Sequence, residues 1–336
     1  MIKKFLSKAA FVIFLPLALC IFGFRFFDVF QIFGFQEYYA NQTISKNRGM
    51  ITTTTYTNRR EHENYNSFIF GSSRSKAFKC IDWKNYLDEN AEPFHFDAST
   101  ENLRGLWQKV NYIESMGDTI KNALVIVDHE LLNNINRQKG HLYISMPCMG
   151  DNNWLDYYFT FFQANMNLKF LSAILDYSIF GEHRRYMGYL IRKKKFPDKV
   201  NSYNCDFWYG YDDEIRIDST QFYLDRLTSG IFYERPNDPY RKSYVVLSRQ
   251  AQIQMLREIN NIFQKNNTKY KIIVSPLYDQ LKIDENSLGI LKSIFGEENV
   301  FDFSGKNDIT DRIYNYYESS HFRTHVARKI LKQVYE

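Results

Sequence analysis

Two short blocks near the ends of the chain hold the residue types that nucleophilic catalysis needs. Residues 71–73 read Gly-Ser-Ser, and residues 318–321 read Glu-Ser-Ser-His. A serine hydroxyl becomes a useful nucleophile when a histidine removes its proton and a carboxylate orients that histidine. A serine of the first block would meet His321 as general base and Glu318 as orienting carboxylate, provided that the fold brings the two blocks together.

The elements that would position these blocks alternate between strand and helix. Five short, nearly continuous apolar runs are typical of strands that are buried on both faces. These runs cover residues 67–70, 94–96, 123–127, 270–274 and 300–303. Apolar residues at helical spacing lie between or after them, in segments 103–113, 256–263, 288–294 and 322–334. The pattern predicts an α/β domain with a doubly wound, mostly parallel, five-stranded sheet of the flavodoxin-like kind.

Polar residues collect where the predicted strands end. Ligands of such sheets bind outside the carboxyl ends of the strands, so these residues form the expected rim of a site. Ser99 follows the second strand and is a candidate N-cap for the next helix. His321 and His325 have the spacing of a zinc-binding pair. The glutamate of that motif is missing after the first histidine and no third ligand is evident, so no metal site is predicted.

The two blocks resemble motifs of the SGNH/GDSL hydrolase superfamily. In that family a Gly-x-Ser block follows the first strand and an Asp-x-x-His block precedes the last helix. The similarity is greatest to a membrane-tethered branch that acts on cell-envelope polymers, which includes the lipoteichoic-acid D-alanylation protein and the alginate O-acetylation proteins. It covers the strand framework from about residue 67 to the C-terminus, without the long insertion. The resemblance implies that Ser73 is the nucleophile, His321 the base and Glu318 the third member.

The chain departs from the family pattern in three places. Ser72 stands where the family usually has Asp, and Glu318 replaces the Asp of the triad. The family's Gly-x-Asn-Asp block donates to the oxyanion through its Asn, whereas residues 128–130 read Asp-His-Glu. Oxyanion donors must therefore come from elsewhere, beginning with the backbone N–H of Ser73. The other candidate oxyanion or substrate contacts are Ser99, Asn102 and Arg74.

A long connection between the third and fourth predicted strands interrupts the alternation of strands and helices. Residues 129–246 are too many for a simple crossover and are predicted to be an insertion that covers one edge of the domain. Its first part, 154–191, has a helical and strongly aromatic pattern, whereas 196–243 looks irregular around an aromatic run at 207–211. A structural cap and a lid that grips substrate or faces a membrane are both compatible with this composition.

The N-terminal segment is predicted to be a single-pass membrane anchor over residues 9–30. Three lysines precede sixteen residues without a charge, and the apolar stretch continues past Arg25, whose charge can reach the headgroups. The lysines favour a cytoplasmic N-terminus and a periplasmic or extracellular main domain. A cleaved signal peptide and a lipoprotein are the alternatives, and neither has a good cleavage site. The expected organisation is an anchor over 1–30, a stalk or loose wrap over 31–66, and the α/β domain over 67–336.

Composition excludes several classes of function. The net charge is +5, and the basic residues are dispersed apart from a run at 192–195, which is interpreted as a solvated helix end. No nucleic-acid-binding motif is present, so no nucleic-acid partner is expected. The four cysteines show no C-x-x-C spacing, which argues against thiol-redox and zinc-ribbon chemistry. The 25 Tyr and 29 Phe are compatible with a surface that meets sugars or a membrane interface. No cofactor is expected.

These features lead to two main hypotheses. The first is a membrane-anchored SGNH-like serine esterase or O-acyltransferase that acts on a cell-envelope polysaccharide. Its expected partners are an envelope glycan or glycolipid and a multi-pass membrane acyltransferase that supplies the acyl group. The second is a catalytically defective protein of the same fold that binds glycan or assembles an envelope biosynthesis complex. A purely structural membrane-complex subunit is the third alternative.

Overall fold

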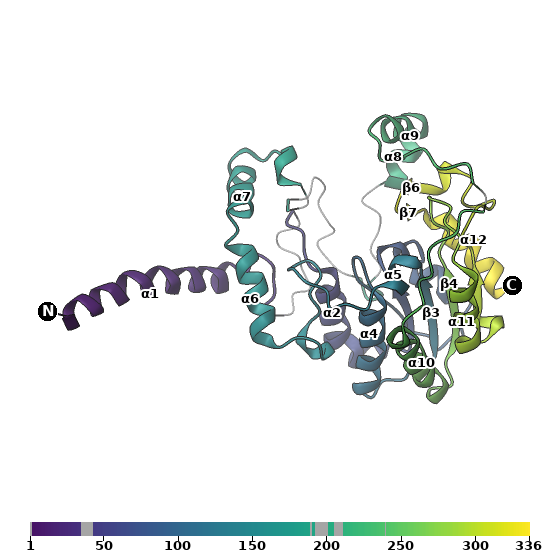
Figure 1. Cartoon of the computed structure of the whole chain (residues 1–336), viewed down its shortest axis with the longest axis horizontal. Helices are drawn as coiled ribbons and strands as arrows, with labels where there is room; N and C mark the ends of the chain where they lie inside the picture. The colour runs from purple at the N-terminus through teal and green to yellow at the C-terminus, as the bar shows by residue number, and fades with distance from the viewer. Residues whose placement is uncertain (1, 35–42, 189, 192–200, 205–210, 239) are drawn as a thin grey trace.

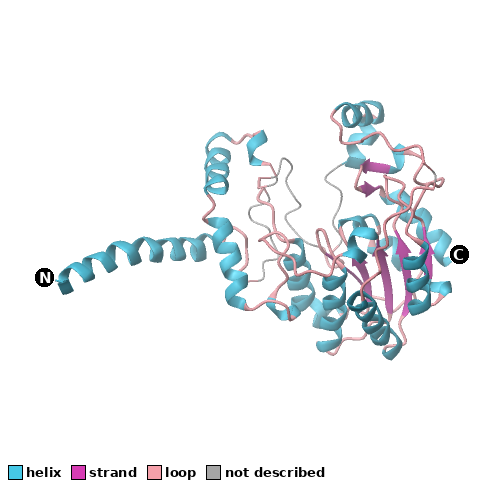
Figure 2. Cartoon of the chain, viewed as in Figure 1, coloured by secondary structure: helices cyan, strands magenta, loops and turns pink. Residues whose placement is uncertain are grey.

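Five parallel strands form the central sheet (Figure 1 and Figure 2). The computed structural model describes residues 2–34, 43–188, 190–191, 201–204, 211–238 and 240–336. The strands are β1 (Ser67–Gly71), β2 (Pro93–Asp97), β3 (Asn122–Val127), β4 (Lys269–Val274) and β5 (Val300–Asp302). Their order is β2-β1-β3-β4-β5, and every neighbouring pair is parallel. The α/β sheet predicted from the sequence is confirmed, with strand ends close to those expected.

Helices cover both faces of this sheet. One face packs against α4 (Leu103–Ser115), α10 (Gln250–Lys265) and α11 (Glu285–Phe295). The other face packs against η1 (Ser73–Ala77), α3 (Cys80–Lys84) and α12 (Thr324–Tyr335). Phe68 and Phe70 of β1 enter the first core and Ile69 enters the second, because successive side chains of a strand point to opposite faces. The sheet is therefore buried on both sides, as its apolar strands predicted.

The segment between the N-terminal helix and the sheet contains a well-packed helix, α2 (Arg48–Glu63). Asn47 caps its first turn, and Tyr56 is fully buried against the aromatic residues of the first core. The prediction of a stalk or loose wrap over 31–66 is therefore wrong for this helix. The run of threonines suggested an exposed chain, but Thr52 and Thr55 lie on the buried face of the helix.

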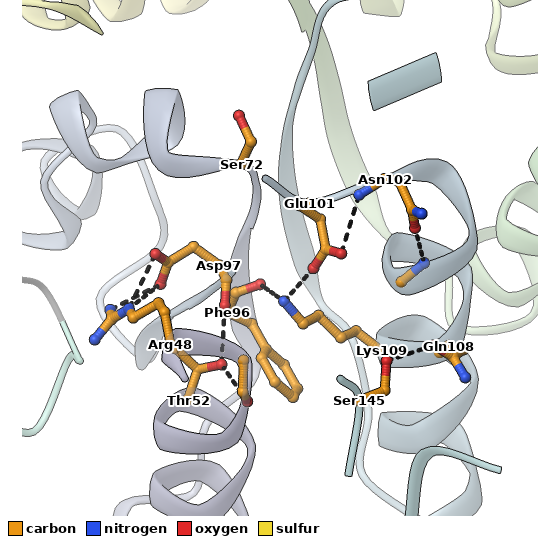
Figure 3. A network of polar contacts seen from close by, with 12 residues as sticks. Arg48, Thr52, Ser72, Phe96, Asp97, Glu101, Asn102, Gln108, Lys109 and Ser145 are labelled. Carbon is orange, nitrogen blue, oxygen red and sulfur yellow. Dashed lines mark hydrogen bonds and ion pairs between the residues drawn. The ribbon is translucent and has the colours of Figure 1, made fainter. Parts of the chain in front are cut away.

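A buried ion pair ties α2 to the carboxyl end of β2 (Figure 3). Arg48 donates to the Asp97 carboxylate from Nε at 3.0 Å and from Nη2 at 2.7 Å. Thr52 donates to the Asp97 carbonyl at 2.9 Å. Burial would raise the pKa of the Asp97 carboxyl, but the Arg48 charge and hydrogen bonds hold that pKa well below its usual range. The pair thus orders the end of β2 next to the candidate site.

A second buried charge pair orders the segment that follows β2. Lys109 on α4 contacts the Glu101 carboxylate and donates to the Phe96 carbonyl at 3.2 Å (Figure 3). Both charged side chains are buried. An isolated buried charge is very costly, so each of these groups depends on the other for its place in the fold.

The insertion between β3 and β4 forms two separate helical parts (Figure 1). The first contains α6 (Trp154–Asn165) and α7 (Leu168–Phe180), as the aromatic helical pattern predicted. The second contains α8 (Tyr211–Ile217) and α9 (Ser219–Thr228), where an irregular chain was expected. These helices are short and gain most of their stability from packing against distant residues. The hydrophobic periodicity of their own sequence is therefore a weak signal. The aromatic run at 207–211 lies outside the described residues except for Tyr211.

The N-terminal helix α1 (Ile2–Phe27) extends away from the domain (Figure 1). Its C-terminal end enters a third apolar cluster through Phe24, which packs on Phe162 of α6. Across the described ranges of the chain, no helix combines the length and the apolar character that a bilayer crossing requires. The transmembrane anchor expected over residues 9–30 therefore stays a prediction.

Replacing Arg48 by methionine should lower the free energy of unfolding by about 3–5 kcal/mol, because Asp97 would lose its partner in a buried site. Urea denaturation followed by circular dichroism measures this loss. Arg328→Met is the matched control, since Arg328 pairs with Asp82 at 2.9 Å while its side chain is 61% exposed. An exposed pair contributes about 0–1 kcal/mol, so equal losses in the two variants would contradict the role given to the buried pair.

Candidate active site

The candidate site lies at the carboxyl edge of the sheet, where β1 and β3 are neighbours. The strand order reverses at this position, and open α/β sheets bind ligands at such switch points. Ser73 follows β1 after a short turn, and Asp128 directly follows β3. The topology therefore places the predicted nucleophile at the part of the rim best suited to a ligand.

The turn after β1 depends on Gly71. Its φ is +155°, and a Cβ atom there would lie 2.8 Å from the Ser75 Cβ and 2.9 Å from the Ile126 carbonyl oxygen of β3. Only glycine allows this close approach. Ser72 is buried, caps the start of η1 and accepts a hydrogen bond from the Ser75 N–H at 2.9 Å. Of the two adjacent serines, Ser73 is thus the one whose hydroxyl is turned to the rim.

A two-stranded antiparallel hairpin carries the other two predicted residues. It pairs β6 (Tyr316–Glu318) with β7 (His321–Phe322), and Glu318 lies opposite His321. The last helix, predicted from residue 322, begins later, because Phe322 belongs to β7 and α12 begins at Thr324. The apolar spacing that starts at Phe322 continues from the strand into the helix, and this hid the boundary.

Ser73, His321 and Glu318 form a continuous chain of hydrogen bonds. The Nε2 atom of His321 lies 2.7 Å from the Ser73 Oγ, and its Nδ1 atom contacts the Glu318 Oε1. The other Glu318 oxygen accepts a hydrogen bond from the Ser320 N–H at 2.9 Å. With Nδ1 engaged by the carboxylate, Nε2 is the nitrogen that can accept the serine proton. The fold thus brings Ser73 next to His321, which lies 248 positions later in the sequence.

Electrostatics favour an ionised carboxylate in this chain. Burial alone would raise the pKa of Glu318. The hydrogen bond and charge of His321, the Ser320 N–H and the charge of Arg74 together hold that pKa below its ordinary value. The His321 and Glu318 side chains remain 20% and 25% exposed, so the site stays open to solvent. An ionised Glu318 can orient the imidazole and stabilise its protonated form.

Arg74 links three loops around the triad. Its Nη1 donates to Asp128 at 2.8 Å and to Glu130 at 2.9 Å, while its Nε donates to the Ser320 carbonyl at 3.1 Å. Burial would lower the pKa of this guanidinium, but the two carboxylates raise it above its ordinary value. Arg74 therefore joins the turn after β1 to the segment after β3 and to the hairpin of Glu318 and His321. These contacts are structural, and they neutralise part of the negative charge beside Ser73.

The second part of the insertion braces the same hairpin. Tyr223 on α9 donates to the Tyr316 carbonyl at 3.0 Å, and Arg226 donates to the Tyr317 carbonyl at 2.9 Å. The Tyr317 hydroxyl donates to Asp212 on α8 at 2.6 Å. These bonds hold the two residues that directly precede the triad carboxylate. Sequence reasoning missed Tyr223 and Arg226, because no motif marks them and their partners are about ninety residues away.

The predicted oxyanion candidates have different environments. Asn102, and not Ser99, is the N-cap of α4. The Asn102 Oδ1 accepts from the Gly105 N–H at 2.9 Å and its Nδ2 donates to the Asn136 carbonyl at 2.9 Å, so its buried side chain serves the helix start. Ser99 lies on the turn after β2 and is partly exposed. The N–H of Ser73 begins η1 and has no acceptor within that short helix.

A second serine–histidine pair lies in the core beside the site. The Ser75 Oγ is 2.8 Å from the His95 Nε2, and both residues are buried. The Ser75 hydroxyl donates its one proton to the Ser72 carbonyl at 2.7 Å, so His95 must be the donor to Ser75. This polarity is the reverse of general-base activation. The pair therefore stabilises the turn that presents Ser73 and is not a second reactive centre.

The two histidines at zinc-like spacing do not converge. His321 faces Ser73, whereas the His325 Nε2 lies 2.9 Å from the Asn315 Oδ1. Within the residues that the structure describes, no group of three or more His, Cys, Asp or Glu side chains could hold a metal ion.

No family model matches this chain, and no curated protein matches it with significant similarity. The chemical interpretation of the site therefore depends on its own geometry.

Substituting Glu318 by glutamine should lower kcat for ester hydrolysis by about 10²–10⁴-fold, because the amide cannot stabilise the protonated imidazole. The matched control is Glu130→Gln, which leaves Asp128 on Arg74 and should keep most of the activity. Steady-state kinetics with p-nitrophenyl acetate measure both. A Glu318→Gln enzyme as fast as the parent would remove the carboxylate from the mechanism.

The lowered pKa of Glu318 sets the sign of a pH effect. A carboxyl whose folded pKa is depressed keeps its stabilising contacts above its ordinary pKa of 4.5 and loses them as the pH falls through the folded value. Protonation of Glu318 should therefore not reduce activity between neutral pH and about 4.5. The measurement is the pH dependence of kcat for the parent protein and for Glu318→Gln. A loss of kcat at acidic pH that is present in the parent and absent from the variant would be due to protonation of Glu318.

Proposed function

We propose that the chain is a membrane-anchored SGNH-like serine esterase or O-acyltransferase that acts on a cell-envelope polysaccharide. The observation that carries the proposal is the hydrogen-bonded chain from Ser73 through His321 to Glu318 at the switch point of the sheet. Nucleophile, base and orienting acid are recognised by geometry and role rather than by position in the sequence. The resemblance of the two motif blocks to envelope-acting relatives supports the choice of a glycan ester as substrate.

The proposed reaction proceeds through an acyl-enzyme. The Ser73 Oγ attacks the acyl carbonyl carbon while the His321 Nε2 takes the hydroxyl proton, and the carbonyl π electrons move to the oxygen. Collapse of this intermediate breaks the bond to the leaving alkoxide oxygen, which receives the proton from His321. Water or a glycan hydroxyl then attacks the acyl-serine by the same steps and regenerates the free serine. The Ser73 N–H is the donor available for the developing oxyanion.

The proposal includes location. The apolar side chains exposed along α1, among them Phe11, Leu19 and Phe22, support insertion of this helix into a bilayer. Lysines at its N-terminal end support a cytoplasmic start, with the catalytic domain in the periplasm or outside the cell. A multi-pass membrane acyltransferase is the proposed acyl donor if the reaction is transfer rather than hydrolysis.

The alternative function is glycan binding or assembly without catalysis. It is favoured by Asp128 and Glu130, which stand in the sequence where the family has an oxyanion-donating Asn and which pair with Arg74 at 2.8 and 2.9 Å. Arg74 offsets these charges, which is why the catalytic proposal is preferred. The alternative predicts glycan binding without a reactive serine.

Ser73→Ala should lower the hydrolysis of p-nitrophenyl acetate by about 10³-fold or more and abolish covalent labelling by a fluorophosphonate. Ser75→Ala is the matched control, because it removes a serine from a histidine pair that has the wrong polarity for catalysis. It should lower stability but retain labelling at Ser73, as located by peptide mass spectrometry. Incubation with an O-acylated envelope polysaccharide then measures release of the acid.

The outcomes separate the two functions. Equal hydrolysis by the parent and Ser73→Ala would refute the catalytic proposal. Absence of labelling together with retained polysaccharide binding would support the alternative.

A further inference from the structure

The third apolar cluster joins the N-terminal helix to the first part of the insertion. Phe30, from the segment after α1, packs on Phe161 of α6 and on Phe170 of α7. Phe24 of α1 also packs on Phe162. The base of α1 and the α6–α7 pair therefore form one packed unit. This unit has its own core, separate from the two cores that cover the sheet.

α6 and α7 each expose an apolar stripe. On α7, Leu168, Leu171, Leu175 and Ile179 recur at helical spacing, and the first, third and fourth of them are 80%, 62% and 70% exposed. None of these four positions is charged. On α6, Leu155 and Phe159 are likewise exposed, one turn apart. Exposed apolar faces of this extent on adjoining helices mark an interaction surface.

This surface is continuous with the exposed apolar residues of α1. A groove of about 720 Å³ runs between α1 and α7, lined on one side by Phe26 and Phe27 and on the other by Leu171 and Leu175. α6 and α7 lie crosswise to α1 at its base (Figure 1). A helix that inserts along the bilayer normal would thus hold the α6–α7 pair parallel to the bilayer surface.

The length of the helices and their continuity with α1 favour a lipid surface as the occupant. α6 and α7 have 12 and 13 residues, too few to cross a bilayer, which needs about 20. Short helices with an apolar face lie in the plane of the interface instead. Lys169 and Arg185 are exposed on this unit, whereas Arg184 pairs with Asp176 at 3.1 Å. The exposed acidic residues Asp156 and Glu182 balance these cations, so the apolar side chains carry the argument for lipid contact.

We propose that α6 and α7 rest on the outer interfacial layer of the membrane in which α1 is anchored, with Leu155, Phe159, Leu168, Leu175 and Ile179 inserted among the lipids. The inference rests on the proposed anchor. The α6–α7 pair then acts as a platform that fixes the distance and tilt of the catalytic domain relative to the bilayer. A single helix alone would let the domain rotate freely around its tether. A platform instead holds the Ser73 rim at a defined height, which suits a substrate that is itself attached to the envelope.

A depth measurement on the full chain tests this platform. The protein is reconstituted into phosphatidylcholine–phosphatidylglycerol vesicles, with and without lipids brominated on their acyl chains. Leu175→Trp adds a fluorophore to α7, and its emission above that of the parent should fall by about two-fold or more with brominated lipid. Leu224→Trp on α9 is the matched control: Leu224 is also exposed, but it lies on the other part of the insertion, and its emission should not change.

The outcomes distinguish the platform from the proposed anchor. If the full chain does not float with vesicles in a density gradient, the anchor proposal fails and the platform fails with it. If the chain floats and Leu175→Trp is not quenched, the platform is overturned while the anchor and the catalytic proposal stand. Cross-linking of residue 175 to a protein in native membranes, without quenching in lipid vesicles, would also overturn it by identifying a protein as the occupant. Fluorophosphonate labelling of Ser73 reports separately on the catalytic proposal.

Discussion

Every strand of the central sheet is parallel to its neighbours, and much of the molecule follows from this constraint. A parallel pair needs a crossover from one end of the sheet to the other, so the connections carry helices that bury both faces. The same constraint places all carboxyl ends of the strands at one edge. Loops from distant parts of the sequence then meet at that edge. The point between β1 and β3, where the order reverses, is left open for side chains to converge.

The arrangement of Ser73, His321 and Glu318 depends on residues outside these three. Ser73 owes its position to Gly71, which allows β1 to turn closely against β3. The hairpin that carries Glu318 and His321 is only two short strands and would be weak alone. Arg74 donates a hydrogen bond to the hairpin at the Ser320 carbonyl, and Arg226 of α9 donates one at the Tyr317 carbonyl. The second part of the insertion therefore has a direct role in positioning the base.

The aromatic content has a structural explanation across three cores. Tyr56 and Phe94 pack in the first core, and Phe78 and Phe322 pack in the second. Phe30 is one of the aromatic residues that join α1 to α6 and α7 in the third core. These rings are buried, so part of the high aromatic fraction serves the cores. The exposed residues on α6 and α7 that suggest contact with lipid are mainly leucine, isoleucine and phenylalanine.

The sequence by itself determined the sheet and the identity of the residues that meet at its edge. Continuous apolar runs mark strands that are buried on both faces, and amphipathic spacing marks α4, α10 and α11, because both patterns are local. The Gly-Ser-Ser and Glu-x-x-His blocks were also visible for the same reason. Tertiary structure alone decided that the two blocks meet within hydrogen-bonding distance, that Asn102 caps α4, and that residues 48–63 pack as a helix on β2. It also decided that α8 and α9 brace the hairpin of Glu318 and His321. These outcomes depend on hydrogen bonds and charge pairs between residues far apart in the sequence. Examples are Arg48 with Asp97 and Arg226 with Tyr317. The local sequence pattern does not indicate such contacts, because it reflects only residues that are near one another in the chain.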